Sequence, residues 1–282
     1  MAGKISINEL RATWESAAPG WAKWEEAFSR NLVDVTGTLL DLAGVASGMH
    51  VLDLAYGAGS QTLQAAKRVG ESGRVVACDI SGEMLKQVRE NAERAGLNNV
   101  ATLRSAAEEF TGAELPFDAS ISRLGLMLFA SPQNALSAVQ RVLKPEARFA
   151  ALVFTTPNKN PFFAQSMAIL LRHGGKQPPQ PGQPGLFALG GPGVLEGLLS
   201  DSGFIDIKMA TVLAPLRLSS ADDALAFMQQ AAGPYRAVVA DLSDNAKADA
   251  WAEVRDGFAQ FENDTGFETD LEFVIGSGAK PA

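Results

Sequence analysis

Two acidic residues and two glycines have the spacing with the clearest chemical meaning in this chain. The stretch Val51–Ser60 (VLDLAYGAGS) contains Asp53, Gly57 and Gly59, and Asp79 follows further along the sequence. A glycine-rich turn between a strand and a helix lets backbone N–H groups approach a nucleotide-like ligand. An acid at the end of the next strand, about 20 residues after the glycines, can bind a pair of ribose hydroxyls. The spacing therefore predicts a nucleoside-binding site.

Alternating strands and helices must position these residues. The pattern predicts strands at His50–Leu54, Arg74–Cys78, Val100–Leu103, Phe117–Ser122 and Arg148–Phe154. It predicts helical segments between them at Gln61–Val69, Gly82–Ala95, Ala107–Phe110 and Pro132–Val142. Strands separated by helices in this way favour a parallel, doubly wound α/β sheet.

The flanking segments are expected to be largely helical. Residues Asn8–Ala43 are predicted as helices interrupted at Pro19-Gly20. After Thr155, the pattern predicts helices at Pro157–Arg172 and Gly191–Ser202, strands at Phe204–Val212 and Leu271–Ser277, and mostly helix over Ser219–Phe261. We expect an N-terminal helical lid (1–44), a nucleoside-binding core (45–155), a cap insertion (156–203) and a final part (204–282) with a helical insertion at 219–265.

Composition excludes several classes of protein. The chain has 282 residues, and its net charge of −8 disfavours nucleic acid as a partner. The single cysteine, Cys78, excludes an internal disulfide, and two histidines leave no metal-ligand cluster, so no metal site is expected. The N-terminal sequence lacks a secretion-signal pattern, and no apolar run reaches the roughly 20 residues of a membrane span. We expect a cytoplasmic protein without a membrane span; a homodimer remains open.

Residues 45–155 resemble the class I S-adenosylmethionine-dependent methyltransferases, and in particular the bacterial small-molecule group that includes quinone C-methyltransferases. The family pattern D-x-G-x-G-x-G corresponds here to Asp53–Gly59, and D-I-S-x-x-M-L is found at Asp79–Leu85. The segment Arg141–Phe149 (RVLKPEARF) is similar to the family's L-K-P-G-G loop and strand. The resemblance implies a Rossmann-like seven-stranded sheet whose last strand is antiparallel, with helical cap insertions.

The same resemblance implies a set of residues that bind S-adenosyl-L-methionine. Asp79 would bind the ribose, Ile80 and Met84 would hold the adenine, and Asp53 would steady the turn. The expected cofactor-binding residues are Asp53, Ala55, Tyr56, Gly57, Gly59, Asp79, Ile80, Met84, Ser105, Ala106 and Arg123.

The chain also departs from the family pattern at several positions. Ser105 stands where an Asp often binds the adenine amino group, and the N–H of Ala106 could still donate to adenine N1. Ala55 and Tyr56 replace a glycine and a small residue, and Glu146-Ala147 replace Gly-Gly. We expect these changes to weaken the binding frame without abolishing it.

No convincing general base emerges from the sequence. Tyr56, Arg123 and His173 are weak candidates for a catalytic role. Tyr56 could touch the methionine end or narrow the site. Arg123 could hold an anionic substrate group or a main-chain carbonyl, or be a surface residue, and His173 could meet the substrate, cap a helix or be solvated. An apolar pocket is expected from Met127, Phe129, Phe154, Phe162, Phe163 and Met167, with the Gly/Pro loop 174–193 as the lid.

The predicted function is methyl transfer from S-adenosylmethionine to a small, largely apolar acceptor such as a phenol or quinone precursor. Two alternatives stay open. One is a protein that binds S-adenosylmethionine and catalyses a reaction without methyl transfer. The other is a binding or regulatory protein with a lapsed site, for which Ser105 and Glu146-Ala147 are the supporting features.

Overall fold

The computed structural model describes residues 6–55, 57, 59–111, 116–180 and 182–282. The α-helices are α1 (Ile7–Asn31), α2 (Val33–Leu42), α3 (Ser60–Val69), α4 (Gly82–Arg94), α5 (Pro132–Val142), α6 (Pro161–Gly174), α7 (Val194–Asp201), α8 (Ala221–Ala231), α9 (Gly233–Val238) and α10 (Asp244–Gly257). The 3₁₀ turns are η1 (Ala107–Glu109), η2 (Leu126–Leu128), η3 (Pro157–Lys159) and η4 (Phe258–Phe261). The strands are β1 (His50–Leu54), β2 (Arg74–Asp79), β3 (Val100–Arg104), β4 (Phe117–Arg123), β5 (Leu143–Phe154), β6 (Ile205–Leu218), β7 (Glu262–Asn263) and β8 (Gly266–Ala279).

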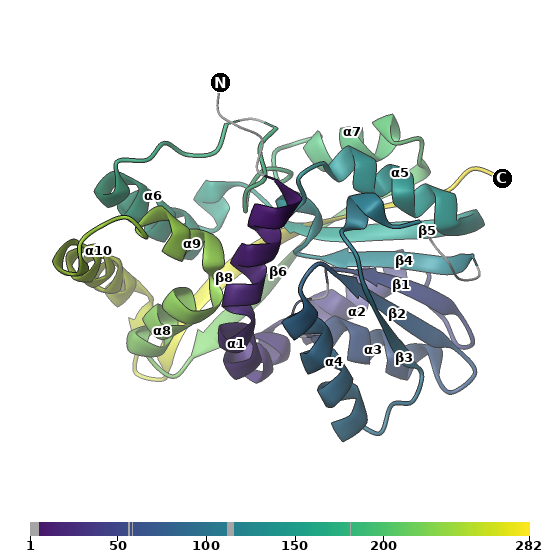
Figure 1. The fold of residues 1–282 in the computed structure, drawn as a ribbon, viewed down its shortest axis with the longest axis horizontal. Coiled ribbons are helices and arrows are strands. Elements are labelled where there is room, and N and C mark those ends of the chain that lie inside the picture. The colour runs from purple at the N-terminus through teal and green to yellow at the C-terminus, as the bar shows by residue number, and fades with distance from the viewer. Residues whose placement is uncertain (1–5, 56, 58, 112–115, 181) are drawn as a thin grey trace.

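One sheet organises the chain (Figure 1). Its strand order is β3-β2-β1-β4-β5-β8-β6, and the short β7 pairs with β8 as a hairpin. Strands β1 to β5 are all parallel to one another, whereas β8 runs antiparallel to both β5 and β6. The predicted doubly wound sheet, with seven strands in the main order and an antiparallel last strand, is confirmed.

The strand order reverses between β1 and β4. The chain passes from β1 outward to β2 and β3 and then returns to β4 on the other side of β1. In open α/β sheets, the carboxyl ends of the strands on either side of such a reversal leave a crevice for ligands. Asp53, Asp79 and Arg123 all lie at or next to the carboxyl ends of these strands.

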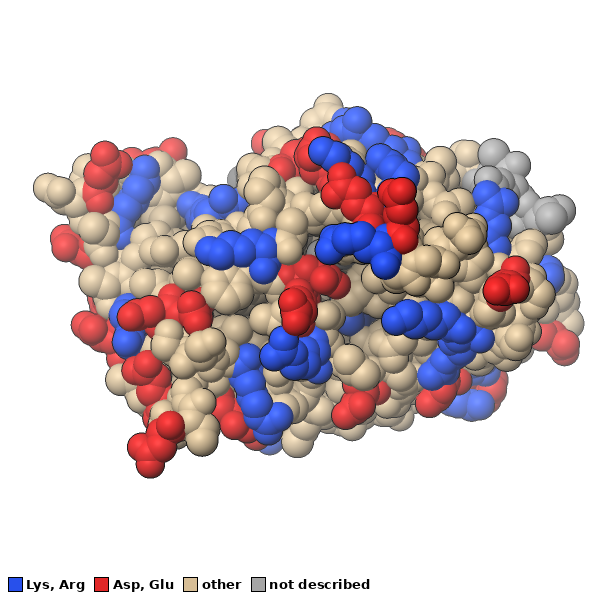
Figure 2. All heavy atoms as spheres, turned by 90° about the horizontal axis from the view of Figure 1, so that it is seen from below, with Lys and Arg blue, Asp and Glu red and all other residues tan. Residues whose placement is uncertain are grey.

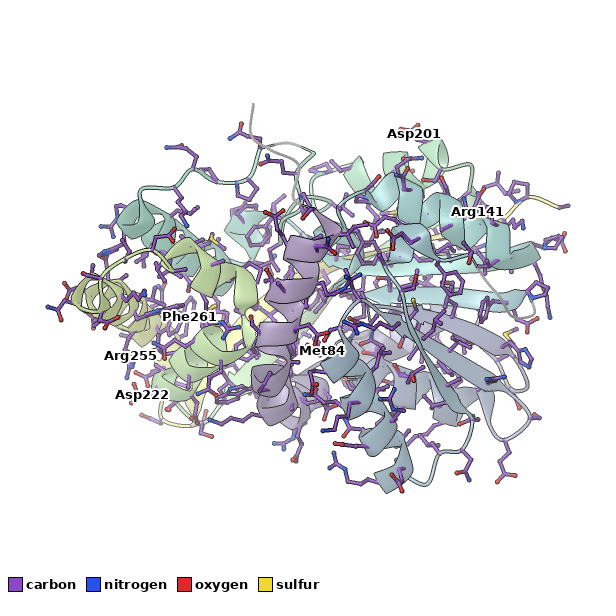
Figure 3. The ribbon with its side chains drawn as sticks, viewed as in Figure 1. Met84, Arg141, Asp201, Asp222, Arg255 and Phe261 are labelled. Carbon is purple, nitrogen blue, oxygen red and sulfur yellow. The ribbon has the colours of Figure 1, made fainter. Side chains whose placement is uncertain are left out.

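Helix α1 lies between the sheet and a second group of helices formed by α6, α8, α9 and α10 (Figure 1). On the sheet side, the Gln87 side chain of α4 donates a 2.8 Å hydrogen bond to the carbonyl of Ala18. On the other side, Trp24 Nε1 donates to Gln230 Oε1 of α8 at 3.0 Å. Figure 3 shows Met84 on the first turn of α4, where this helix faces α1.

The second helical group has its own polar and aromatic contacts. Arg255 of α10 donates to Asp222 of α8 at 2.5 Å, near Phe261 of η4 (Figure 3). Inside, the ring of Phe162 on α6 packs against Phe258 and Phe267, with centroid distances of 4.9 and 5.5 Å. Helices α6, α8, α9 and α10, together called the cap below, therefore share one apolar cluster with the central strands.

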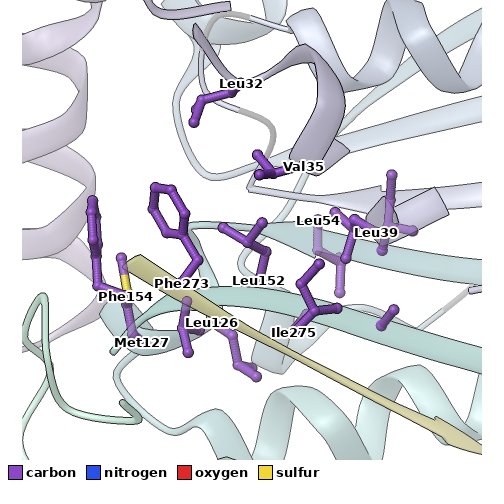
Figure 4. Packing of buried hydrophobic residues seen from close by; sticks show 14 of the residues in the cluster. Leu32, Val35, Leu39, Leu54, Leu126, Met127, Leu152, Phe154, Phe273 and Ile275 are labelled. Carbon is purple, nitrogen blue, oxygen red and sulfur yellow. The ribbon is translucent and has the colours of Figure 1, made fainter. Parts of the chain in front are cut away.

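A single large apolar core joins α2, the central strands and the cap. Figure 4 shows Leu39 of α2 and Leu54 of β1 facing Leu152 and Ile275, which belong to neighbouring strands β5 and β8. Because both faces of the central strands are covered, these strands consist of nearly continuous apolar residues. No helix among the described residues is both long and apolar enough to cross a lipid bilayer.

Several boundaries differ from the sequence prediction: strands β5, β6 and β8 are longer than expected, and two helical segments are divided differently. Helix α1 continues through Pro19-Gly20 and ends only at Asn31, because packing on both sides holds it together. A Cβ atom at Gly20 would lie 1.9 Å from the carbonyl oxygen of Gln230, so the helix approaches α8 closely at this point. The expected helix Pro157–Arg172 is divided at Asn160, whose buried side chain exchanges hydrogen bonds of 2.9 and 3.1 Å with the backbone of Glu272.

We expect Gly20→Ala to lower the free energy of unfolding by about 1–3 kcal/mol, because the added methyl group must push α1 away from α8. Gly37→Ala in α2 is the matched control, since its nearest neighbour, Gln64 Nε2, is 3.8 Å from the added atom. That change should be neutral or should stabilise by up to about 1 kcal/mol. Urea denaturation of both variants measures the difference, and equal effects would contradict the close approach.

Candidate active site

A cavity of about 850 Å³ lies at the carboxyl ends of β1, β2 and β4. Its floor is the sheet edge, one wall is α1, and the remaining walls come from α6, α8, α9 and the loop between α6 and α7. Its volume is near the top of the range of about 300–1,000 Å³ that is common for small-molecule pockets. On the outer face drawn in Figure 2, acidic and basic side chains are interspersed.

Asp53 holds the turn between β1 and α3. Its carboxylate is fully buried and accepts hydrogen bonds from Thr62 Oγ1 at 2.5 Å and Gln61 Nε2 at 3.2 Å. The partners found among the described residues are thus side chains of α3, which tie this helix to the end of β1. Burial raises the pKa of Asp53 to about 6, although both hydrogen bonds oppose the rise.

Three of the described residues of the turn are left-handed. Ala55, Gly57 and Gly59 have φ angles of 54°, 60° and 97°. At Gly59 a Cβ atom would lie 2.3 Å from Val88 Cγ2, so this glycine also allows α3 to start directly against α4. The first turn of α3 brings Ser60 to the cavity wall, and the leading N–H groups of a helix have no partner within the helix. Tyr56, a predicted site residue, lies outside the described residues.

Asp79 ends β2 and lines the cavity. Its Oδ1 accepts the backbone N–H of Ser81 at 2.9 Å. Burial raises the pKa of Asp79 to about 7, and the nearby charge of Asp53 acts in the same direction. Four neighbouring residues predicted to surround an adenine line the same part of the cavity: Ile80, Met84, Ser105 and Ala106.

Arg123 is an interior residue, and its surface alternative is wrong. The guanidinium donates to Thr36 Oγ1 at 2.8 Å and to Ser60 Oγ at 2.6 Å, and it lines the cavity. Burial lowers the pKa of Arg123 to about 10, while the charges of Asp53 and Glu25 act in the opposite direction. Arg123 is therefore a cation at neutral pH, placed between the turn after β1 and the end of β4.

Other predicted residues lie elsewhere. His173 does not line the cavity; its Nε2 is 2.8 Å from Oε2 of Glu253 on α10. Phe162, expected in the pocket wall, is fully buried in the cap core instead. The other five residues of the expected apolar pocket do line the cavity: Met127, Phe129, Phe154, Phe163 and Met167.

The sequence analysis missed two glutamates on α1. Glu15 accepts the N–H of Gly82 at 2.8 Å and the hydroxyl of Ser81 at 2.9 Å, and it pairs with Arg104 at 3.1 Å. Glu25 lines the cavity from above. Burial raises the pKa of Glu25 above its ordinary value, although the charge of Arg123 opposes this. The one available signal was helical spacing: Glu25 lies on the same face of α1 as Trp14 and Trp21, and all three line the cavity.

Comparison with known proteins supports a specific family. Residues 46–169 match the family model described as a methyltransferase domain. Over this segment, which is less than half of the 282 residues, the chain is similar to that methyltransferase domain. A ubiquinone/menaquinone biosynthesis C-methyltransferase of Erwinia tasmaniensis is 38% identical over 140 residues, which are 48% of this chain and 56% of that enzyme. The chain thus spans about half the length of this curated relative.

Solved structures extend the similarity of fold beyond the methyltransferase domain. The [4+2]-cyclase SpnF has a TM-score of 0.62 at 17% identity, covering 98% of this chain and 97% of that one. A phosphoethanolamine N-methyltransferase 2 of Haemonchus contortus, in complex with S-adenosyl-L-methionine, has a TM-score of 0.59 at 19% identity over 99% of this chain and 61% of that one. Among the residues that our structure describes, no group of His, Cys, Asp and Glu side chains is arranged to hold a metal ion.

The raised pKa of Asp79 gives a prediction for stability against pH. Between its ordinary pKa of 3.8 and about 7, the folded state keeps a proton that the unfolded state has lost. Raising the pH through this window should therefore destabilise the wild type relative to Asp79→Asn, by on the order of 2–4 kcal/mol. Denaturant unfolding of both proteins across the window measures the difference.

Asp118→Asn is the control for this experiment, because the pKa of Asp118 is shifted the other way. Burial opposes ionisation of Asp118, but hydrogen bonds from Lys144 and His50 N–H outweigh it and lower the pKa. The stability that Asp118 contributes should be present above its ordinary pKa and lost on acidification. Parallel pH curves for wild type and Asp79→Asn would show that Asp79 titrates normally.

Proposed function

We propose that this protein transfers a methyl group from S-adenosylmethionine to a bulky, largely apolar acceptor. The observation that carries the proposal is that one cavity joins two chemically different parts. A polar part lies over the turn after β1 and the end of β2, and an apolar part lies beneath α1 and the cap. A charged nucleoside and an apolar molecule can therefore meet in one enclosed space.

The residues around Asp79 fit the nucleoside end of the cofactor. The buried carboxylate of Asp79 suits a bidentate interaction with two ribose hydroxyls. Ile80 and Met84 offer apolar surface to a flat ring, with Ser105 and Ala106 at its edge. The Ser105 hydroxyl donates to the Ala106 carbonyl at 2.9 Å, which leaves the serine oxygen as an acceptor.

The turn and Arg123 fit the amino-acid end. Gly57 brings the main chain to the cavity, and the start of α3 at Ser60 favours a negative charge such as a carboxylate. Arg123 adds a fixed cation beside it. When bound here, S-adenosylmethionine supplies an electrophilic methyl group on a positively charged sulfur. The chain's own contribution is alignment and exclusion of water.

The apolar part of the cavity indicates a neutral acceptor. Its polar side chains are mostly engaged: Tyr235 donates to the Phe163 carbonyl at 3.0 Å, and Lys176 donates to the Ala237 carbonyl and pairs with Asp241. The rest is aromatic and aliphatic surface, including Met167 and Phe187. Hydroquinones and phenols with apolar substituents match this chemistry, and the C-methyltransferase name of the relatives supports a quinone precursor.

A reaction without methyl transfer is the second candidate, because a [4+2]-cyclase shares the fold over nearly the whole chain. A lapsed site has less support. Glu146, which belongs to one of its two indications, lies within β5 with a left-handed φ of 65°, donates its N–H to the carbonyl of Lys280, and does not line the cavity. Methyl-labelled S-adenosylmethionine, incubated with phenol, hydroquinone and naphthohydroquinone probes with and without alkyl chains, tests the proposal. Label in an alkylated probe supports it; binding of cofactor without label transfer to any probe favours the second candidate.

Asp79→Asn should weaken binding of S-adenosylhomocysteine by about 10–100-fold at a pH above 7, because a charge-assisted contact to the ribose is lost. Isothermal titration calorimetry measures this. Asp41→Asn, which changes an exposed acid on α2 that pairs with Arg68, is the matched control and should bind like wild type. Unchanged affinity of Asp79→Asn would remove Asp79 from the cofactor site.

Met167→Lys should lower kcat/KM for an alkylated hydroquinone by about tenfold or more, because an unpaired charge would enter the apolar part of the cavity. Met167→Leu keeps the size and polarity and should stay close to wild type. Affinity for S-adenosylhomocysteine should be the same in both variants. Full turnover in Met167→Lys would show that the acceptor binds elsewhere.

A further inference from the structure

We infer that Glu25, on the lid helix α1, binds the α-ammonium group of the cofactor and forms with Arg123 a charge pair that recognises an amino-acid head group. The inference rests on the proposed function and adds a specific residue from outside the sheet to that site. It also makes α1 a part of the cofactor site and not only a cover over it.

The first observation is the position of Glu25. It lies on α1, lines the cavity and is half-buried. Among the described residues, no hydrogen bond or ion pair to its carboxylate is found. A partly buried carboxylate without such a partner is costly in the folded state, unless a ligand supplies one. The other glutamate that lines the cavity, Glu108, already accepts the N–H of Ser131 at 3.1 Å.

The second observation is charge complementarity. Glu25 and Arg123 are close enough for each charge to act on the other, and both line the cavity. The guanidinium of Arg123 is held from behind by Thr36 and Ser60. A zwitterionic amino acid carries one negative and one positive group on a single carbon atom. An opposed acid and base on two walls of one cavity match that arrangement.

The third observation is how α1 is placed. Glu15 fixes the helix at Ser81-Gly82, next to the ribose-binding acid Asp79. Glu25 follows ten residues later, which is about 15 Å further along an α-helix. The helix thus runs from the Ser81-Gly82 contact along the cavity wall, and its Glu25 lines the cavity beyond that contact.

Several other charged groups bear on Glu25 and must be separated from it in any titration. The charges of Arg94 on α4 and of Glu26 on the same helix both act on its carboxylate without a direct contact. Asp53 lies behind Arg123, and Asp79 lies at the end of β2. A variant of Glu25 alone leaves all four in place, so a difference between two ligands in that variant isolates the contribution of Glu25.

Two ligands that differ only in the amino-acid part provide the test. S-adenosylhomocysteine has the head group, and 5′-methylthioadenosine lacks it. Isothermal titration calorimetry should show that Glu25→Gln weakens S-adenosylhomocysteine by about 10–100-fold, as expected for loss of a charge-assisted hydrogen bond. The affinity for 5′-methylthioadenosine should change by less than about twofold.

Glu26→Gln is the matched control, because it removes the same charge from the adjacent, exposed position that pairs with Arg30. It should leave the affinity ratio of the two ligands unchanged. Equal weakening of both ligands by Glu25→Gln, or no weakening of either, would overturn the inference. Failure of the wild type to bind either nucleoside would instead overturn the proposed function itself.

Discussion

The buried carboxylate of Asp53 is the constraint on which the rest of the site depends. It lies at the end of β1 without access to solvent, so its hydrogen-bonding capacity must be met inside the protein. Gln61 and Thr62 meet it, and both belong to the first turn of α3. Helix α3 is thereby tied to the end of β1, and the short connection between them has to pass through left-handed conformations. Because α3 is held there, its first residue, Ser60, lies at the wall of the cavity. Ser60 in turn accepts a hydrogen bond from the guanidinium of Arg123 and keeps that group at the same wall.

Helix α1 is held by an interface on each side. Toward α4, Glu15 makes polar, partly exposed bonds that contribute little individually, and Ala18 and Trp21 pack with residues of α4 in a small apolar cluster. Toward α8, Trp21, Trp24 and Phe28 surround Phe227, with ring centroids 5.2–6.1 Å apart. Burial of aromatic surface is worth considerably more. Trp21 belongs to both interfaces, so apolar contacts hold α1 on the side of α4 and on the side of α8.

Local signals in the sequence predicted most of the sheet, because buried strands, helix caps and glycine turns are encoded by neighbouring residues. Strand β1 and helix α5 have the predicted boundaries. The antiparallel last strand followed only from the family resemblance. What failed depended on partners far away in the sequence: α1 continues through Pro19 because α4 and α8 hold it, and Asn160 divides a helix because it binds the backbone of β8. Glu15 and Glu25 escaped notice for the same reason, since nothing near them in the sequence indicates what they face.

The two parts of the cavity differ in how far sequence similarity can explain them. The match to the methyltransferase domain ends at residue 169, within α6. Beyond that point lie Leu171, Phe187, Phe227 and Tyr235, all of which line the apolar part of the cavity. Structures that share the fold over almost the whole chain have 17–19% identity, so this arrangement of helices recurs without a recurring set of side chains. Under the proposed function, the acceptor would therefore be selected mainly by the walls that α1 and the cap supply, because fold alone does not determine a substrate.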